Sequence, residues 1–348
     1  MIRHFRGKIL HGLKHYLFNI LLIWLAILFY RYNPYYKSFL LPLTQSALFY
    51  LALTYTVLGL FFYIILPIER IPKSKGLLIF QTFKRTLIDT WRYLKNFTLD
   101  TNHPPPKIEK HEKVAILFVL VKLYFLPLML NFMFGNYEAV KSGLGTLPGL
   151  STLLTINSFN NIIFPLLISL VFFIDTLFFT FGYTFEAGFL KNKIRSVETT
   201  ALGWIVVLLC YPPFNGLFNN YSDWYANDNV FFYSSSLTFF VRIALILLLF
   251  VYVSATLSLG TKSSNLTNRG IVGYGPYRHV RHPAYISKNL FWWITIIPVM
   301  NIFAFLSMLS WSVVYFLRAI TEERHLIQDP DYQAYCKKVK YRFIPGVW

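Results

Sequence analysis

The chain has 348 residues, of which 55% are hydrophobic and 19% aromatic, while only 14% are charged. One soluble core of this size cannot bury so much apolar surface, so the composition excludes an ordinary soluble protein and predicts a polytopic membrane protein. The formal net charge is +18. Nucleic acid is not expected as a partner, because the basic residues lie between apolar stretches and are not gathered on one soluble domain.

Apolar stretches of about twenty residues predict the membrane-spanning helices. Six of them lie at residues 16–30, 46–66, 114–134, 162–185, 201–218 and 237–259. A last pair, at 288–300 and 302–317, is expected to form a helical hairpin that turns at Asn301. The expected fold is therefore an all-α membrane protein with about eight transmembrane helices.

The distribution of Lys and Arg predicts the orientation of these helices. When the loops are assigned to alternate sides, 28 of the 33 basic residues fall on one side. The positive-inside rule assigns that side to the cytoplasm. Both termini and the polar segment at residues 273–285 are therefore expected to face the cytoplasm.

We expect two regions. Residues 1–236 form an N-terminal transmembrane region with a cytoplasmic amphipathic insertion at about 69–113, and residues 237–348 form a C-terminal region that carries the chemistry. In the insertion, apolar residues recur at helical spacing, at Leu77, Phe80, Phe83, Leu87, Trp91 and Leu94. This pattern predicts a helix that either lies in the interface against anionic head groups or packs on the protein's own cytoplasmic face. The sequence Asn-His-Pro-Pro-Pro at 102–106 predicts a stiff connector.

Asp175 lies in a predicted span, where a charge is costly and needs a partner or a cavity. A structural ion pair with Lys122 or Arg242 is the expected explanation. Contact with the polar end of a substrate and simple protonation are the alternatives. The two cysteines, Cys210 and Cys336, are too isolated to predict a disulfide or a metal site.

The polar segment 273–285 has the sequence GYGPYRHVRHPAY and lies between two apolar stretches. Two glycines, Gly273 and Gly275, allow a tight turn and a close approach of the backbone to a ligand. Such a pair also occurs in plain turns. The glycines alone therefore indicate little about function.

Two cations and one titratable ring, Arg278, Arg281 and His282, stand at the predicted start of the hairpin. By themselves they would be explained as positive-inside anchors. The adjacent pair Glu322 and Glu323 runs against that bias at the same interface. These carboxylates form an ion-pair network with the arginines or bind a cation.

With these motifs, residues 259–348 resemble the integral-membrane methyltransferases typified by isoprenylcysteine carboxyl methyltransferase and the phospholipid N-methyltransferases. The shared pattern is a GPY-x-x-x-RHP-x-Y segment, a helical hairpin, an EE pair, and a tail in which tyrosines precede a basic stretch. The matching residues are Gly275-Pro276-Tyr277, Arg281-His282-Pro283-Ala284-Tyr285, Glu322-Glu323, Tyr332, Tyr335, Tyr341-Arg342 and Pro345-Gly346.

The resemblance implies an S-adenosylmethionine-dependent enzyme that methylates a lipophilic acceptor from the bilayer, such as a prenylcysteine-like carboxylate, a lipid amine or another isoprenoid. No metal is implied. Carboxylates suit the cofactor's ammonium and sulfonium, and arginine suits its carboxylate. The implied cofactor-binding residues are Gly273, Gly275, Tyr277, Arg278, His282, Tyr285, Glu322 and Glu323. The implied catalytic residues are Arg281, His282 and Glu323.

The sequence also departs from this family. Many relatives have a small residue, usually glycine, soon after the position of Tyr285, where this chain has Ile286-Ser287-Lys288-Asn289. The tail from Tyr335 to Pro345 also resembles the membrane sterol reductases, which share the RHP-x-Y hairpin and bind NADPH. Those usually carry an acidic residue where Lys288 and Asn289 stand here. The alternatives are therefore a sterol or isoprenoid reductase-like enzyme and a non-catalytic lipid-binding protein.

Overall fold

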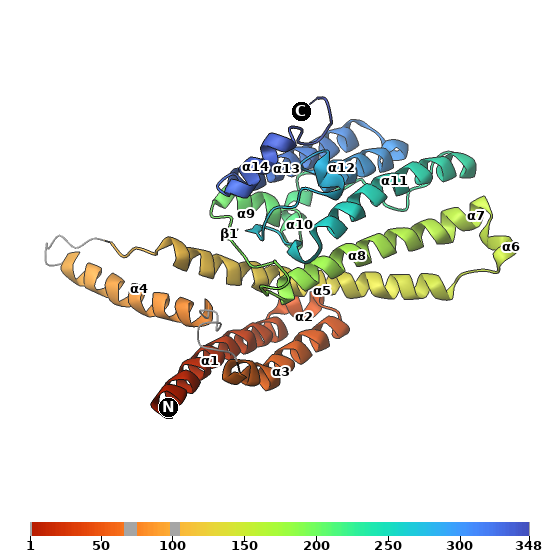
Figure 1. Cartoon of the computed structure of the whole chain (residues 1–348). Coiled ribbons are helices and arrows are strands. Elements are labelled where there is room, and N and C mark those ends of the chain that lie inside the picture. Colours follow the sequence, from red (N-terminus) through yellow and green to blue (C-terminus); the bar gives the residue numbers. More distant parts are fainter. Residues whose placement is uncertain (1, 66–74, 98–104, 348) are drawn as a thin grey trace. The chain divides into compact units, whose positions relative to one another are not determined.

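The computed structural model describes residues 2–65, 75–97 and 105–347. The chain divides into two compact units, residues 1–131 and 132–348, each of which is described by itself (Figure 1). The expected connector at 102–106 lies mostly outside the described residues. The expected division at residue 236 concerns where the chemistry begins and stays a prediction.

Six helical segments in the described part of the chain are long and apolar enough to cross a membrane. They are Gly12–Tyr32, Pro42–Tyr63, Lys110–Gly145, Ile156–Thr184, Ser235–Lys262 and Ile302–Leu326. This confirms the predicted class, a helical protein with several long apolar helices. Six of the eight expected spans coincide with these helices, while the count of eight and the orientation stay predictions.

One expected span is not a continuous helix. The stretch 201–218 forms two short helices, α9 (Ala201–Leu208) and α10 (Phe214–Asn219). Pro212 and Pro213 stand between them. Because proline lacks a backbone N–H and disfavours helical geometry in the residue before it, the helix ends here despite its apolar composition.

The expected hairpin forms, but its first arm begins five residues earlier than expected, at Pro283, and ends at Thr295. Helix α12 (Pro283–Thr295) has 13 residues, which is about 20 Å at the helical rise. Helix α13 (Ile302–Leu326) begins after Asn301, whose side-chain oxygen accepts a hydrogen bond from the backbone N–H of Ala304 at 2.9 Å. The turn at Asn301 is thus explained by N-capping.

The unit 1–131 contains α1 (Ile2–Tyr32), α2 (Pro34–Phe39), α3 (Pro42–Ile65), α4 (Lys75–Phe97) and most of α5 (Lys110–Gly145). Side-chain hydrogen bonds join its apolar helices. Asn19 of α1 donates to the hydroxyl of Tyr63 on α3 at 2.8 Å. Asn131 of α5 accepts from Thr44 of α3 at 3.0 Å. Such interhelical bonds align helices that lipid would otherwise solvate equally well on every side.

Helix α4 is amphipathic, as the insertion pattern predicted. Five of its six apolar positions are exposed, namely Phe80, Phe83, Leu87, Trp91 and Leu94, and Leu77 is buried. On its other face, Thr82 and Arg85 donate to the carboxylate of Glu112 on α5 at 3.0 and 2.6 Å. The polar face is therefore the one fastened to protein, and the exposed apolar stripe favours the interfacial interpretation.

The unit 132–348 contains most of the remaining elements. They are α6 (Leu150–Leu153), α7 (Ile156–Ser158), a π-helical turn (Phe159–Ile163), α8 (Phe164–Thr184), β1 (Ser196–Val197), α9, α10, α11 (Ser235–Leu259), β2 (Thr267–Asn268), α12, α13 and α14 (Pro330–Lys338). Its apolar core is shared by α8, α11, α12 and α13, which contribute Phe164, Leu245, Phe291, Trp292 and Trp311 among others. Strand β1 pairs antiparallel with β2, with Ser196 opposite Asn268.

Asp175 on α8 does not form the expected pair with Arg242. Its carboxylate accepts hydrogen bonds from Tyr252 and Thr256 of α11 at 2.8 and 2.6 Å. The Arg242 guanidinium donates instead to backbone carbonyls, including that of Asn229 at 2.8 Å. Backbone carbonyl oxygens in an apolar environment need hydrogen-bond donors, and the Arg242 guanidinium supplies them for these carbonyls.

Candidate functional site

A polar cavity of about 130 Å³ lies in the unit 132–348. Its wall is built by β2, by the segment that leads to α12, by the ends of α12 and α13, and by residues from α9 and α14. We name it the Glu322 cavity. The ionisable and amide side chains that line it are Glu198, Lys262, Asn265, Asn268, Arg269, Tyr277, Arg281, His282, Tyr285, Arg318, Glu322, His325, Tyr332 and Tyr335.

Glu323 on α13 is buried behind this wall and joins three elements. Its carboxylate accepts hydrogen bonds from His282 Nε2 at 3.0 Å, Arg281 Nη1 at 3.1 Å and Arg342 Nε at 2.9 Å. A carboxylate accepts only, so the His282 proton on Nε2 points to Glu323. Both oxygens of Glu323 are thereby used to hold the start of α12 and the tail together.

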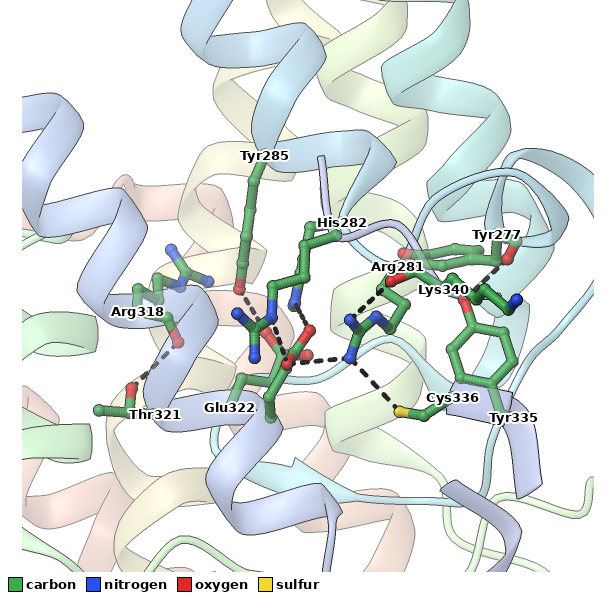
Figure 2. A network of polar contacts seen from close by, with 12 residues as sticks. Tyr277, Arg281, His282, Tyr285, Arg318, Thr321, Glu322, Tyr335, Cys336 and Lys340 are labelled. Carbon is green, nitrogen blue, oxygen red and sulfur yellow. Dashed lines mark hydrogen bonds and ion pairs between the residues drawn. The ribbon is translucent and has the colours of Figure 1, made fainter. Parts of the chain in front are cut away.

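Glu322 has different surroundings, although it is the next residue. It is exposed and lines the cavity, where its Oε2 accepts a hydrogen bond from the Tyr285 hydroxyl at 2.7 Å (Figure 2). Neighbouring residues on an α-helix point about 100° apart. Of the two glutamates, Glu322 is therefore the one whose carboxylate faces the cavity.

The chain's tail runs along the segment before α12. The backbone N–H groups of Arg281 and His282 donate to the carbonyls of Tyr341 and Arg342 at 3.0 and 2.9 Å. Arg281 also donates to the carbonyl of Lys340 at 3.0 Å. Burial lowers the pKa of Arg281, but the Glu323 carboxylate outweighs this and raises it above its ordinary value, so Arg281 stays charged.

Two rings form a flat surface beside the cavity. His282 and Tyr285 are stacked, with ring centroids 5.4 Å apart and an interplanar angle of 4°. Tyr277 also lines the cavity, and burial raises its pKa above the ordinary value, so its hydroxyl stays neutral. The Tyr335 hydroxyl of α14 donates to the carbonyl of Tyr277 at 2.7 Å, which fixes α14 at the same wall (Figure 2).

The glycines of the GYG sequence lie outside the cavity. Gly275 has φ +61° and packs so closely on Ser258 of α11 that a Cβ would collide with the serine hydroxyl. Gly273 is exposed, and a Cβ there would contact the Tyr335 ring at 3.3 Å. Their role in this structure is to let the turn pack between α11 and α14. The glycines that line the cavity are Gly203 of α9 and Gly270, which has φ +98°.

Of the residues implied by resemblance, the structure brings Tyr277, Arg281, His282, Tyr285 and Glu322 to the cavity and places Glu323 directly behind them. It does not bring Arg278 there. Arg278 is exposed and donates to the His279 ring at 2.9 Å. Of the two arginines expected in the ion-pair network with the glutamates, Arg281 takes part and Arg278 does not, while Arg342 of the tail joins Arg281 at Glu323.

Residues 236–328 match the isoprenylcysteine carboxyl methyltransferase (ICMT) family. This stretch runs from α11 through α13 and contains the polar segment and both glutamates. The C-terminal third of the chain is ICMT-like. The match supports a membrane methyltransferase in general. No curated protein matches the chain.

Within the ICMT-like region, Arg318 was not foreseen as a site residue, because its position among basic residues near the C-terminus suggested a surface anchor. It is buried on α13 and lines the cavity. Its guanidinium carbon lies 5.1 Å from the Tyr285 ring centroid, and Nη2 donates to Asn265 at 2.6 Å. Arg318 lies four positions before Glu322, so both side chains lie on one face of α13. This spacing is the sequence pattern that could have identified Arg318 as a site residue.

Residues before the ICMT-like region also contribute to the wall. Glu198, which follows β1, is buried and lines the cavity. His325 of α13 shares a hydrogen bond of 2.8 Å with Ser196 of β1. Strands β1 and β2 lie about seventy positions apart in the sequence, and their pairing brings the residues around Ser196 to the cavity. No local sequence pattern indicated this pairing. The described residues contain no group of three or more His, Cys, Asp or Glu that is suited to a metal ion.

Proposed function

We propose that the chain is an S-adenosylmethionine-dependent methyltransferase of a lipophilic acceptor, with the cofactor in the Glu322 cavity. The observation that carries this proposal is the open carboxylate of Glu322, which lies among aromatic rings and cations in the ICMT-like region. An apolar protein has little other use for such a polar cavity.

The donor set fits the cofactor's chemistry. Glu322 offers a carboxylate for the amino group or the sulfonium, and the faces of Tyr277 and Tyr285 attract positive charge. Lys262 and Arg269 line the same cavity and suit the cofactor's carboxylate. When bound, S-adenosylmethionine supplies a methyl group on a positively charged sulfur. The residues around it hold it in position and keep water away.

The size of the cavity implies that it opens on binding. At about 130 Å³ it is smaller than the ~300–1,000 Å³ of typical small-molecule sites. Helix α14 is held at this wall by the hydrogen bond from Tyr335 to Tyr277 and by the packing of Tyr332, Tyr335 and Val339. We infer that α14 shifts outward to admit the cofactor.

The hydrogen bonding of His282 bears on the acceptor. Its Nε2 proton is held by Glu323, so that nitrogen does not serve as a general base. An amine acceptor must lose a proton before it attacks, whereas a carboxylate is already ionised at pH 7. This favours a carboxylate acceptor, which needs positioning only. Glu323 and Arg281 then act by holding His282 and Tyr285 in place.

Calorimetric titration of the purified protein with S-adenosylmethionine and with NADPH tests the proposal. The wild type should bind S-adenosylmethionine, and Glu322→Gln should weaken binding by about 1.5–3 kcal/mol, the value of a hydrogen bond to a charged group. Glu138→Gln, an exposed glutamate on α5, is the matched control and should bind normally. Binding of NADPH alone would end the proposal. Unchanged affinity in Glu322→Gln would remove Glu322 from the site.

We also propose that the cavity faces the cytoplasm and that the chain crosses the membrane an even number of times. The support is the concentration of 28 of the 33 basic residues on one predicted side. Single cysteines at positions 107, 223 and 337, in a chain with Cys210 and Cys336 replaced by serine, should label with an impermeant thiol reagent. Only position 223 should react from outside. Reaction of positions 223 and 337 from the same side would refute the topology.

A further inference from the structure

A second cavity, of about 410 Å³, lies beside the middle and C-terminal part of α12, whereas the Glu322 cavity lies at its N-terminal end. It is lined by Lys288 and Trp292 of α12, by Phe172 of α8, and by residues of the loop 224–229. We name it the Lys288 cavity. It shares no lining residue with the Glu322 cavity.

Lys288 is surrounded by rings, and the carboxylates of Asp175 and Asp228 attract its charge without accepting a hydrogen bond from it. Its ammonium nitrogen lies 5.1 Å from the ring centroids of Phe172 and Tyr252 and 5.4 Å from that of Trp292. Within the described ranges, no carboxylate or other acceptor lies at bonding distance from this nitrogen. The nearby carboxylate of Asp175 already accepts from two hydroxyls. Rings attract the charge but leave its three hydrogen-bond donors unused.

An ammonium without an acceptor is costly in an apolar environment. Lys288 lines a cavity, so an acceptor can reach it there. Three side chains of the cavity rim, Asn227, Asp228 and Asn229, are polar. Burial raises the pKa of Asp228, and the charge of Lys288 lowers it. The cation, the two amides and the rings together suit an anionic group attached to an apolar chain.

The loop that closes this cavity is firmly attached to the helices. Trp224 packs edge-on against Trp292 and Trp311, with ring centroids 4.7 and 5.2 Å away. Arg242 of α11 donates to the carbonyl of Asn229 at 2.8 Å. Ser307 of α13 donates to the carbonyl of the residue that precedes Trp224. The cavity is therefore framed by specific contacts on both sides of the loop.

We propose that the Lys288 cavity binds the phosphate or carboxylate group of a membrane amphiphile, with Lys288 as its hydrogen-bonding cation. This site is additional to the proposed cofactor site and does not depend on it. Lys288 follows Tyr285 by three positions, so both lie on neighbouring parts of one face of α12. The two cavities are therefore successive along this helix.

The test uses the purified full chain in dodecyl maltoside and titrates it calorimetrically with dodecyl phosphate, dodecanoate and dodecanol. The wild type should bind one or both anions more tightly than the neutral alcohol, and the two anions distinguish a phosphate from a carboxylate ligand. Lys288→Met should weaken anion binding at least about ten-fold, the scale of a lost charge-assisted bond. Lys288→Arg should retain it.

The matched control is Lys191→Met, which removes an exposed lysine from the same unit and should leave anion binding unchanged. If Lys288→Met does not fold, Lys288→Gln, which keeps a polar end without the charge, decides in its place. Equal affinity of the wild type for dodecanol and both anions, or an equal loss in Lys191→Met, would overturn the proposal. A wild type that binds the anions but not S-adenosylmethionine would refute the proposed enzyme and keep this site.

Discussion

Each compact unit holds a buried glutamate that bonds to an arginine, and the two differ in what lies beside them. In the unit 1–131, Glu112 accepts from Thr82 and Arg85 of α4, and this fastens α4 to α5. In the unit 132–348, Glu323 pairs with two arginines and a histidine. A cavity lies beside it, and the neighbouring Glu322 lines that cavity. The buried glutamate therefore has the same role in both units, which is to fasten one segment of the chain to another. The candidate chemistry depends on the carboxylate next to it, which stays open on one side.

The largest effect is expected from Glu323→Gln. It leaves the half-buried Arg281 and the buried His282 without their counter-charge, and loss of one partner of a buried pair costs about 3–5 kcal/mol of unfolding free energy. Thermal unfolding in detergent measures it. Cofactor binding should fall as well, because His282 and Tyr285 lose their positions. A Glu323→Gln protein with wild-type unfolding temperature would contradict the role assigned to Glu323.

Two further variants sharpen this test. Glu112→Gln should lower the unfolding temperature by breaking the bond between α4 and α5, while cofactor affinity stays normal. Glu322→Gln should instead lower cofactor affinity and leave the unfolding temperature unchanged, because Glu322 is exposed and, in the described part of the chain, its carboxylate accepts a hydrogen bond from Tyr285 alone. If both variants lost stability and binding together, the distinction between the fastening and the open carboxylate would fail.

The smallest effect on stability is expected in helix α4. Leu87 and Trp91 are exposed, so changing both to glutamate should alter the unfolding free energy by about 0.5 kcal/mol or less. Hydrogen exchange of residues 75–97 in anionic vesicles should nevertheless rise, because the apolar stripe loses its contact with lipid. Gln81→Glu, on an exposed polar position of α4, is the control. Loss of cofactor affinity in the double variant would show that α4 belongs to the site.

The sequence predicted the long helices because a run of apolar residues long enough to cross a bilayer has few other uses. It also predicted the hairpin turn at Asn301, since asparagine is a preferred N-cap. It failed at residues 201–218, where the apolar count outweighed the two adjacent prolines. Composition measures how well a segment suits lipid, whereas Pro212 and Pro213 decide whether its backbone stays helical.

The candidate site was predicted in part. The resemblance placed Arg281, His282 and Tyr285 beside the glutamates, and the structure brings them together. It did not separate Glu322 from Glu323, because which of two adjacent helical residues faces a cavity depends on how the helix is rotated against its neighbours. Arg318 was overlooked for a related reason. A count of basic residues treats every arginine as exposed, and only packing against Tyr285 shows otherwise.

The contacts of Glu323 have a consequence for the order in which the protein is made. Its partners Arg281 and Arg342 lie 42 positions before it and 19 positions after it. Chains fold from the N-terminus as they leave the ribosome. The helices are therefore made before the arginine of the tail, and until then Glu323 has two of its three partners, Arg281 and His282. The contacts of Glu323 are complete only once residue 342 has been made, so a chain truncated before residue 342 lacks one of the three bonds that hold the start of α12 and the tail together.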